Sequence, residues 1–147
     1  MDWNDVVRRA QAARGDGAFL STSGSDGRPH VAWVGVGYGD ETFWTATFRS
    51  SQKAKNLSEN PAVALHWQEH REHLVFARAR ARLVDTAAEA RELWDRAVLP
   101  YPPEMFWSSS DDPELQFVEL VPEKVTIWGA DHRGTPDVWR RTQSTRS

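Results

Sequence analysis

Residues 73–85 carry the clearest hydrophobic pattern in the chain, a strict alternation. Apolar side chains stand at every odd position of its middle part, and Arg78, Arg80 and Arg82 stand between them. Successive side chains of a strand point to opposite faces, so a period of two indicates extended structure. The pattern therefore predicts a strand over residues 73–85 with one buried face and one face rich in arginine.

Shorter extended runs, separated by turn signals, predict further strands. They cover residues 17–23, 28–38, 42–47, 62–67, 115–121 and 124–128. Glycine-containing turns at 24–27 and 39–41 join the first three into an antiparallel meander. We expect Pro122 to separate the last two strands, because proline has no N–H group for sheet pairing.

Helical spacing appears in three places. Apolar residues after Asp2 recur every three to four positions until Gly15. A second helix is expected from about Ser51 to Asn60, before a proline. The third opens with a capping box at residues 86–89 and ends before a proline cluster, after which residues 104–113 are expected to form a loop.

Many short strands with few helices favour a mainly β protein, a small closed or partly closed antiparallel barrel of six or seven strands with short flanking helices. At 147 residues the chain fits one such domain. We therefore expect an N-terminal amphipathic helix over residues 1–16, a barrel over 17–129 and a polar C-terminal extension over 130–147.

Composition narrows the class of protein. A hydrophobic content of 39% and a mean hydropathy of -0.64, with no long apolar run, predict a soluble protein that does not cross a membrane. The first residues lack a secretion signal and the chain has no cysteine, which fits the cytoplasm. A net charge of -3 argues against non-specific nucleic-acid binding.

The most informative candidate site is the strand-to-helix junction at residues 47–57, Thr-Phe-Arg-Ser-Ser-Gln-Lys-Ala-Lys-Asn-Leu. The first turn of a helix carries unpaired N–H groups and the positive end of the peptide dipoles, which suit an anion such as a phosphate. Ser51 adds a hydroxyl, while Lys53 and Arg49 add charge-assisted hydrogen bonds. The alternative is that a serine caps a surface helix whose lysines are solvated. The spacing alone leaves both readings open.

Several short motifs occur in an order that resembles a known family. They lie at residues 27–31, 39–40, 47–54, 56–57 and 60–65. This order resembles that of the split-barrel flavoproteins related to pyridoxamine 5'-phosphate oxidase, over roughly residues 17–129. The most specific element is a threonine, three residues, a serine, one residue and a Lys-Ala pair, followed by Asn-Leu and Asn-Pro. The resemblance implies a split β-barrel with FMN, or the deazaflavin F420, as cofactor.

The resemblance also implies roles for individual residues. The cofactor phosphate would be held by Thr47, Ser51 and Lys53, with Arg49, Ser50 and Gln52 nearby. The ring system would lie against Val31, Ala32, Trp33 and Val34, with His30 or an arginine at the subunit interface beside its polar edge. Members of the family are usually homodimers with the cofactor sites at the interface, so a partner chain would complete each pocket.

Differences from the family pattern bear on the activity. Trp33 stands where relatives often have proline, and Leu74 where the oxidase has glutamine; residues 138–143 do not reproduce the oxidase's terminal substrate motif. We therefore expect an FMN- or F420-dependent oxidoreductase that is not the oxidase itself, with a small-molecule substrate stacked beside Trp33 or Trp107. The cofactor supplies the chemistry, and no catalytic side chain is identified. The alternatives are a non-catalytic flavin-binding or sensor module, and a barrel without cofactor.

Two further groups of residues have competing interpretations. Arg78, Arg80 and Arg82 would suit the polyanionic tail of F420, but a solvated face paired with acidic residues is favoured. His66, His70 and His73 have a spacing that on one helix would suit zinc, yet they fall on a strand end and a loop, so we expect no metal.

Overall fold

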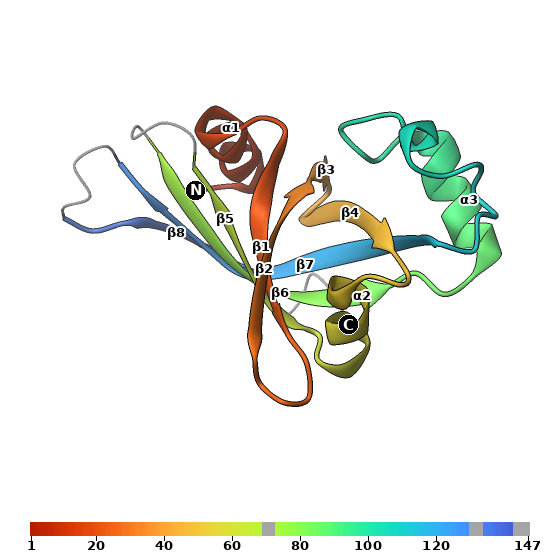
Figure 1. Cartoon of the computed structure of the whole chain (residues 1–147). Helices are drawn as coiled ribbons and strands as arrows, with labels where there is room; N and C mark the ends of the chain where they lie inside the picture. The colour runs from red at the N-terminus through yellow and green to blue at the C-terminus, as the bar shows by residue number, and fades with distance from the viewer. Residues whose placement is uncertain (69–72, 130–133, 143–147) are drawn as a thin grey trace.

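The computed structural model describes residues 1–68, 73–129 and 134–142. These residues form an eight-stranded antiparallel sheet in the order β2-β1-β5-β6-β7-β4-β3, with β8 paired to β7. The strands are β1 (Gly17–Ser23), β2 (Pro29–Gly35), β3 (Gly37–Gly39), β4 (Thr42–Phe48), β5 (Ala62–Trp67), β6 (Leu74–Leu83), β7 (Leu115–Trp128) and β8 (Asp137–Arg140). The sheet curls into an open half-barrel (Figure 1), which confirms the mainly β split barrel.

In the described part of the chain three short helices flank the sheet, α1 (Trp3–Ala13), α2 (Gln52–Glu59) and α3 (Ala87–Arg96), and a 3₁₀ turn, η1 (Pro103–Met105), follows α3. α1 packs against β6. Figure 1 places α2 below the end of β4 and α3 at the far end of the molecule. Within the described residues, no helix has both the length and the apolar character that crossing a membrane requires.

The alternation in β6 is confirmed, since Val75, Ala77 and Ala79 are buried while Arg78 and Arg80 are exposed. The strand count differs from the expected six or seven. Residues 28–38 divide into β2 and β3, and residues 137–140 of the polar extension form β8.

Pro122 does not divide the last strand, which was expected to be two. The pairing of β7 with β4 ends at Leu120, and its pairing with β8 begins at Lys124. Pro122 lies between these two partners, so its missing N–H breaks no ladder bond on that side. The register with β6 shifts at the same place, pairing Ala79 with Pro122 but Arg78 with Lys124, so Glu123 forms a bulge and the strand continues.

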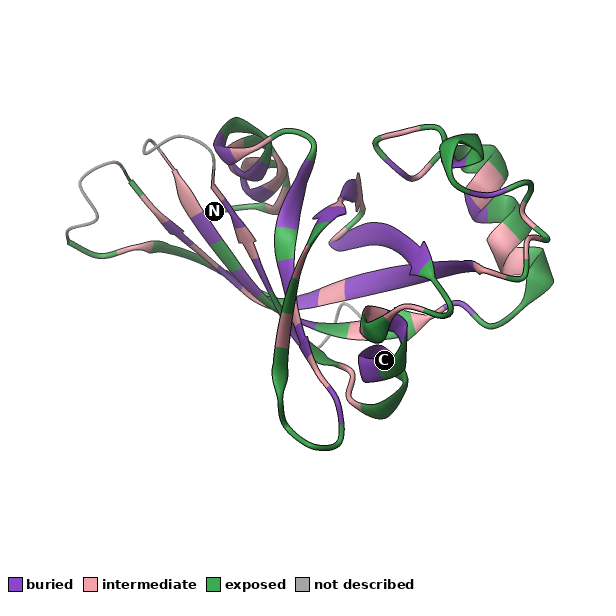
Figure 2. Ribbon diagram, in the orientation of Figure 1, coloured by how far each residue is buried: buried purple, intermediate pink, exposed green. Residues whose placement is uncertain are grey.

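Two hydrophobic clusters lie on opposite sides of β4 and β7. The larger cluster fills the half-barrel, where α1 covers it and Trp139 of β8 contributes to it. The smaller one lies between β4, β7, α3 and the segment after α3, and includes Trp44, Leu93 and Trp107. β4 is consequently buried on both faces along nearly its whole length (Figure 2). This arrangement holds the end of β4 rigidly beside α2.

Candidate functional site

The junction between β4 and α2 is ordered by hydroxyl groups. Ser51 is the N-cap of α2, and its Oγ accepts a hydrogen bond from the Ala54 amide at 3.1 Å. The Thr47 hydroxyl lies 3.0 Å from the Ser51 hydroxyl. The turn itself is closed by the Ser51 amide, which donates to the Phe48 carbonyl at 2.9 Å. The last residues of the strand and the first turn of the helix therefore form one fixed unit.

Lys53 is the unusual residue of this junction. Its side chain is half-buried and has no hydrogen-bond or ion-pair partner among the described residues. Burial lowers the pKa of its ammonium group, because the charged form loses water without gaining a counter-charge. The first turn of α2 holds no acidic residue, so the cation faces the positive end of the helix uncompensated. A bound anion would compensate both the lost hydration of the ammonium group and its repulsion by the positive end of the helix.

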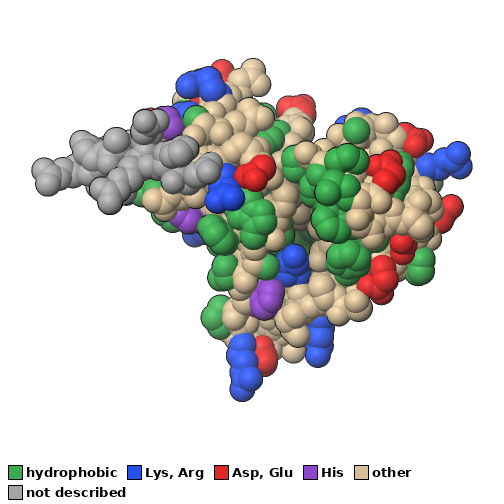
Figure 3. All heavy atoms as spheres, turned by 45° about the horizontal axis from the view of Figure 1, so that its top comes forward, with side chains coloured by type: hydrophobic (Ala, Val, Ile, Leu, Met, Phe, Trp, Pro, Cys, Tyr) green, Lys and Arg blue, Asp and Glu red, His purple; other side chains and the backbone are tan. Residues whose placement is uncertain are grey.

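A cavity of about 470 Å³ lies against this junction. One side is formed by Trp33, Val34 and Gly35 of β2, and the base by residues 46–48 of β4 together with Lys53. In Figure 3, hydrophobic side chains gather along the hollow between the barrel and the part of the molecule that contains α3. The volume of this cavity falls within the range of small-molecule sites, which are mostly apolar with a few precisely placed polar groups.

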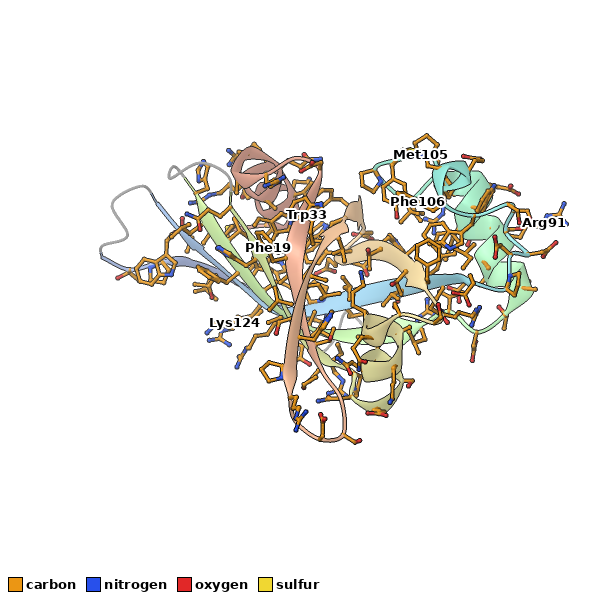
Figure 4. All side chains as sticks on the ribbon, in the orientation of Figure 1. Phe19, Trp33, Arg91, Met105, Phe106 and Lys124 are labelled. Atoms are coloured by element: carbon orange, nitrogen blue, oxygen red, sulfur yellow. The ribbon has the colours of Figure 1, made fainter. Side chains whose placement is uncertain are left out.

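The opposite wall comes from the segment after α3, which contributes Tyr101, Met105, Phe106 and Trp107. Phe106 packs edge-on against Tyr101, with ring centroids 5.3 Å apart, while buried Trp107 packs on Phe48 at 5.1 Å. Met105 and Phe106 remain 66% and 51% exposed, respectively, in spite of their apolar character. Figure 4 shows both side chains across the opening from Trp33.

The structure brings four of the predicted cofactor-site residues into this cavity, Thr47, Lys53, Trp33 and Val34, together with Trp107, which was expected beside the substrate. Ser51 adjoins them through its contact with Thr47. β3 and most of β4 separate the β2 strand from the junction in the chain, and the fold brings the two together in one cavity.

Three neighbours in the motif make hydrogen bonds within the protein and are absent from the cavity lining. The bonds join Arg49 Nη1 to Gln116 Oε1 (2.8 Å), Ser50 Oγ to Glu114 Oε2 (2.7 Å) and Gln52 Nε2 to Asn56 Oδ1 (2.8 Å). These contacts tie the junction to β7, to Glu114 just before β7, and to α2.

The remaining predicted residues of β2 also lie outside the lining. Val31 is 62% exposed, and Ala32 is half-buried. His30 pairs with Thr22 of β1, and its Nδ1 is buried with no hydrogen-bond partner among the described residues. The cavity therefore meets only the C-terminal end of β2.

The arginines of β6 differ from one another. Arg82 forms ion pairs with Glu89 and Glu119, whereas Arg78 and Arg80 are exposed and have no ion-pair partner in the described part of the chain.

The histidine group is only partly described. His66 stacks on Phe76 with ring centroids 4.4 Å apart, and its ring nitrogens contact the Val75 carbonyl and Gln68. His73 precedes β6, and His70 lies outside the described residues. Across residues 1–68, 73–129 and 134–142, no three His, Cys, Asp or Glu side chains are grouped to hold a metal ion.

Sequence reasoning missed Tyr101, Met105 and Phe106 as lining residues. For Met105 and Phe106 the signal was an apolar group in residues 104–113, a segment expected to be a loop, whose side chains had to pack on something; Tyr101 lies before that segment, within the proline cluster. Nothing local indicated that these residues would pack across from β2.

The family model for pyridoxamine 5'-phosphate oxidase matches residues 9–129 of the sequence. The chain belongs to this family. A search of the curated proteins finds no match.

Solved structures with similar folds have low sequence identity to this chain. A Clostridium acetobutylicum protein related to general stress protein 26 has a TM-score of 0.75 at 14% identity, covering 95% of this chain and 96% of its own. PhzG from Burkholderia lata, in complex with tetrahydrophenazine-1-carboxylic acid, has a TM-score of 0.71 at 17% identity, and the match covers 95% of this chain and 85% of PhzG. The heme storage protein HutZ from Vibrio cholerae has a TM-score of 0.64 at 16% identity, and the match covers 86% of this chain and 93% of HutZ. These likenesses concern the fold, which evidently serves different ligands.

Proposed function

We propose that this protein is an FMN-dependent oxidoreductase acting on a small organic substrate, with the cofactor phosphate at the N-terminus of α2. The observation that carries the proposal is Lys53, a half-buried cation without a partner among the described residues, which lines the cavity beside a helix N-terminus. Family membership supports it. A phosphate dianion supplies the counter-charge that this junction lacks.

The residues present fit the group. Thr47 and Lys53 lie at the polar end of the cavity, where they would bind the phosphate. Trp33 and Val34 form a flat apolar wall suited to the cofactor's ring system. The bound flavin would supply hydride or electron transfer. The chain's own residues bind its phosphate, orient its ring and exclude water from the ring.

A second copy of the chain is part of the proposal. Trp33, Phe19, His66 and Phe76 form one cross-strand row over β2, β1, β5 and β6, and Phe19 and Phe76 are 41% and 42% exposed. Such a row on an open sheet face suits burial against a partner. Because Trp33 belongs to both this row and the cavity, a homodimer would cover the cofactor. Dilution that separates the dimer should then release FMN; tight FMN binding by a monomer would contradict this.

F420 is the alternative cofactor, since exposed Arg78 and Arg80 suit an acidic tail. A non-catalytic flavin-binding or sensor module is the alternative function. A cytoplasmic location, expected from the cysteine-free sequence, belongs to the same proposal.

The first experiment identifies the ligand. The purified protein should show a flavin spectrum and release FMN, identified by mass, on denaturation. Release of F420 would favour the alternative cofactor, and a Soret band would indicate haem instead. A bound flavin that neither NAD(P)H nor reduced F420 reduces would favour the non-catalytic module.

The site itself is tested by Lys53→Ala. Loss of a charge-assisted hydrogen bond to phosphate should weaken FMN binding by about 2 kcal/mol, which is roughly thirtyfold. Riboflavin, which has no phosphate, should bind wild type and variant alike. Lys55→Ala is the matched control, because Lys55 is exposed on the same helix and does not line the cavity. Equal FMN affinity of wild type and Lys53→Ala would refute the phosphate site.

A further inference from the structure

Most polar side chains of the cavity already have an assigned partner. Asp16 pairs with Arg14 at 3.1 Å, and Thr47 contacts Ser51. Lys53 is assigned to the cofactor phosphate by the proposed function. Two further polar groups of the lining have no partner among the described residues, the Trp107 Nε1 and the Tyr101 hydroxyl. Trp107 Nε1 is buried, whereas the Tyr101 hydroxyl is not among the buried unpaired atoms and is therefore exposed to solvent; Tyr101 also lines a second hollow beside α3.

Close packing on β2 and β3 fixes the position of Tyr101. A Cβ atom at Gly35 would lie 2.7 Å from Tyr101 Cε1, and one at Gly37 would lie 1.7 Å from the Val98 carbonyl oxygen. Glycine at both positions therefore lets residues 98–101 lie directly against the strand backbone. Phe106 packs edge-on against the Tyr101 ring, which further restricts it. The phenol is consequently held on the cavity wall.

Burial raises the pKa of Tyr101 above its ordinary value. Tyr101 is therefore neutral at physiological pH and can donate a hydrogen bond from its O–H group.

The charges of the lining limit the kind of compound that fits beside Tyr101. Among the described lining residues, Lys53 is the only cation, and the proposed phosphate neutralises it. Asp16 is an anion in the same lining. A second negatively charged compound would meet no free positive charge here. Phe106 and Met105 offer apolar surface, which favours an uncharged ring.

We propose that Tyr101 and Phe106 form the substrate subsite for a flat, uncharged aromatic compound that carries a carbonyl oxygen. The Tyr101 hydroxyl donates a hydrogen bond to that oxygen, and the Phe106 ring covers the aromatic face. This inference rests on the proposed function, because it assumes that the cofactor occupies the polar end of the cavity.

The test uses two probes of similar shape on the FMN-loaded protein, the quinone menadione and the hydrocarbon methylnaphthalene, with binding followed by equilibrium dialysis. Wild type should prefer the quinone. Tyr101→Phe should bind menadione about tenfold more weakly, as expected for one unmade hydrogen bond, and bind methylnaphthalene unchanged. Phe106→Ala should weaken both probes alike, because it removes the apolar cover.

Tyr38→Phe is the matched control. The Tyr38 hydroxyl accepts a hydrogen bond from Trp67 Nε1 at 3.1 Å, and Tyr38 is absent from the cavity lining, so its loss should leave both probes unchanged. Undiminished menadione binding by Tyr101→Phe overturns the inference, as does failure of wild type to bind either probe. FMN binding is measured first on every variant. Wild type that binds no FMN overturns the proposed function, whereas normal FMN binding without a Tyr101 effect overturns the subsite alone.

Discussion

The N-termini of α2 and α3 are built alike and differ in charge. Ser51 and Thr86 are both hydroxyl N-caps that accept an amide hydrogen bond, at 3.1 and 3.2 Å respectively. In α3 the first turn contains Glu89, which suits the positive end of the helix and is bound by Arg82 through two hydrogen bonds of 2.9 and 2.7 Å. In α2 the corresponding turn contains Lys53, which no acidic residue of that turn compensates.

The pKa values report the same difference. Hydrogen bonds from Arg82 lower the pKa of Glu89, so its charged form is stabilised by the protein. Burial lowers the pKa of Lys53, so its charged form is destabilised. The charge at the start of α3 is therefore compensated within the protein, whereas Lys53 at the start of α2 is compensated by no acidic residue of that turn. The second is the one that faces a cavity.

The largest effect is expected from removing the internal compensation at α3. Arg82→Ala deletes the hydrogen bonds to Glu89 and to Glu119, a carboxylate only 4% exposed. Because hydrogen bonds to charged groups contribute about this much, we expect the free energy of unfolding, measured in urea, to fall by about 2 kcal/mol. Arg80→Ala is the control, since Arg80 is exposed on the same strand, and its cost should stay within about 0.5 kcal/mol. Equal costs would show that the Arg82 contacts add no stability.

A pair of cap variants separates the two helix starts. Ser51→Ala and Thr86→Ala should each cost about 1 kcal/mol of unfolding free energy, as loss of an N-cap does. Only Ser51→Ala should also weaken FMN binding, because its hydroxyl belongs to the proposed phosphate site. Thr86→Ala is its control for general destabilisation. A loss of FMN affinity in both variants would mean that helix stability, rather than a contact, controls binding.

The smallest effect concerns pH. The pKa of Lys53 is lowered on folding, so between that lowered value and about 10.5 the unfolded chain binds more protons and stability rises with pH. Near neutral pH the cost of the buried charge is fully present. The unfolding free energy of the ligand-free wild type, relative to Lys53→Ala, should thus increase from about pH 7 to about pH 10. Bound FMN should remove this increase by pairing the charge. A flat difference without FMN would contradict the argument.

Much of the fold could be predicted from local patterns. The alternation around Arg78 and Arg80 predicted β6, because a strand with one buried face imposes a period of two on its own sequence. The expected break at Pro122 was wrong, because the effect of a proline in a strand depends on which strand pairs with it. Pro122 lies between the part of β7 that pairs with β4 and the part that pairs with β8. Residues 28–38 divide between Gly35 and Gly37, the two positions on which residues 98–101 pack, and that packing is not visible in the local sequence.

The candidate site could be predicted only in part, because a local pattern does not say which side chains from distant segments will pack against it. The junction motif named Thr47, Ser51 and Lys53, and the structure brings them together at the edge of a cavity. Arg49 and Gln52 belong to the same motif but are turned to partners on β7 and α2. Helix and strand geometry fix the position of the Cα and Cβ atoms of a residue, and the surrounding packing decides which groups its side chain contacts.

The sequence by itself determined the strands, the helix caps and an anion-suited junction, because these depend on residues within one or two turns of each other. Only the tertiary structure decided that Lys53 would have no partner among the described residues, and that Trp33 and Phe106 would face each other across a cavity. Trp33 and Phe106 are more than 70 residues apart in the chain. Their placement on opposite sides of the cavity is set by the packing of two separate cores on the two faces of β4.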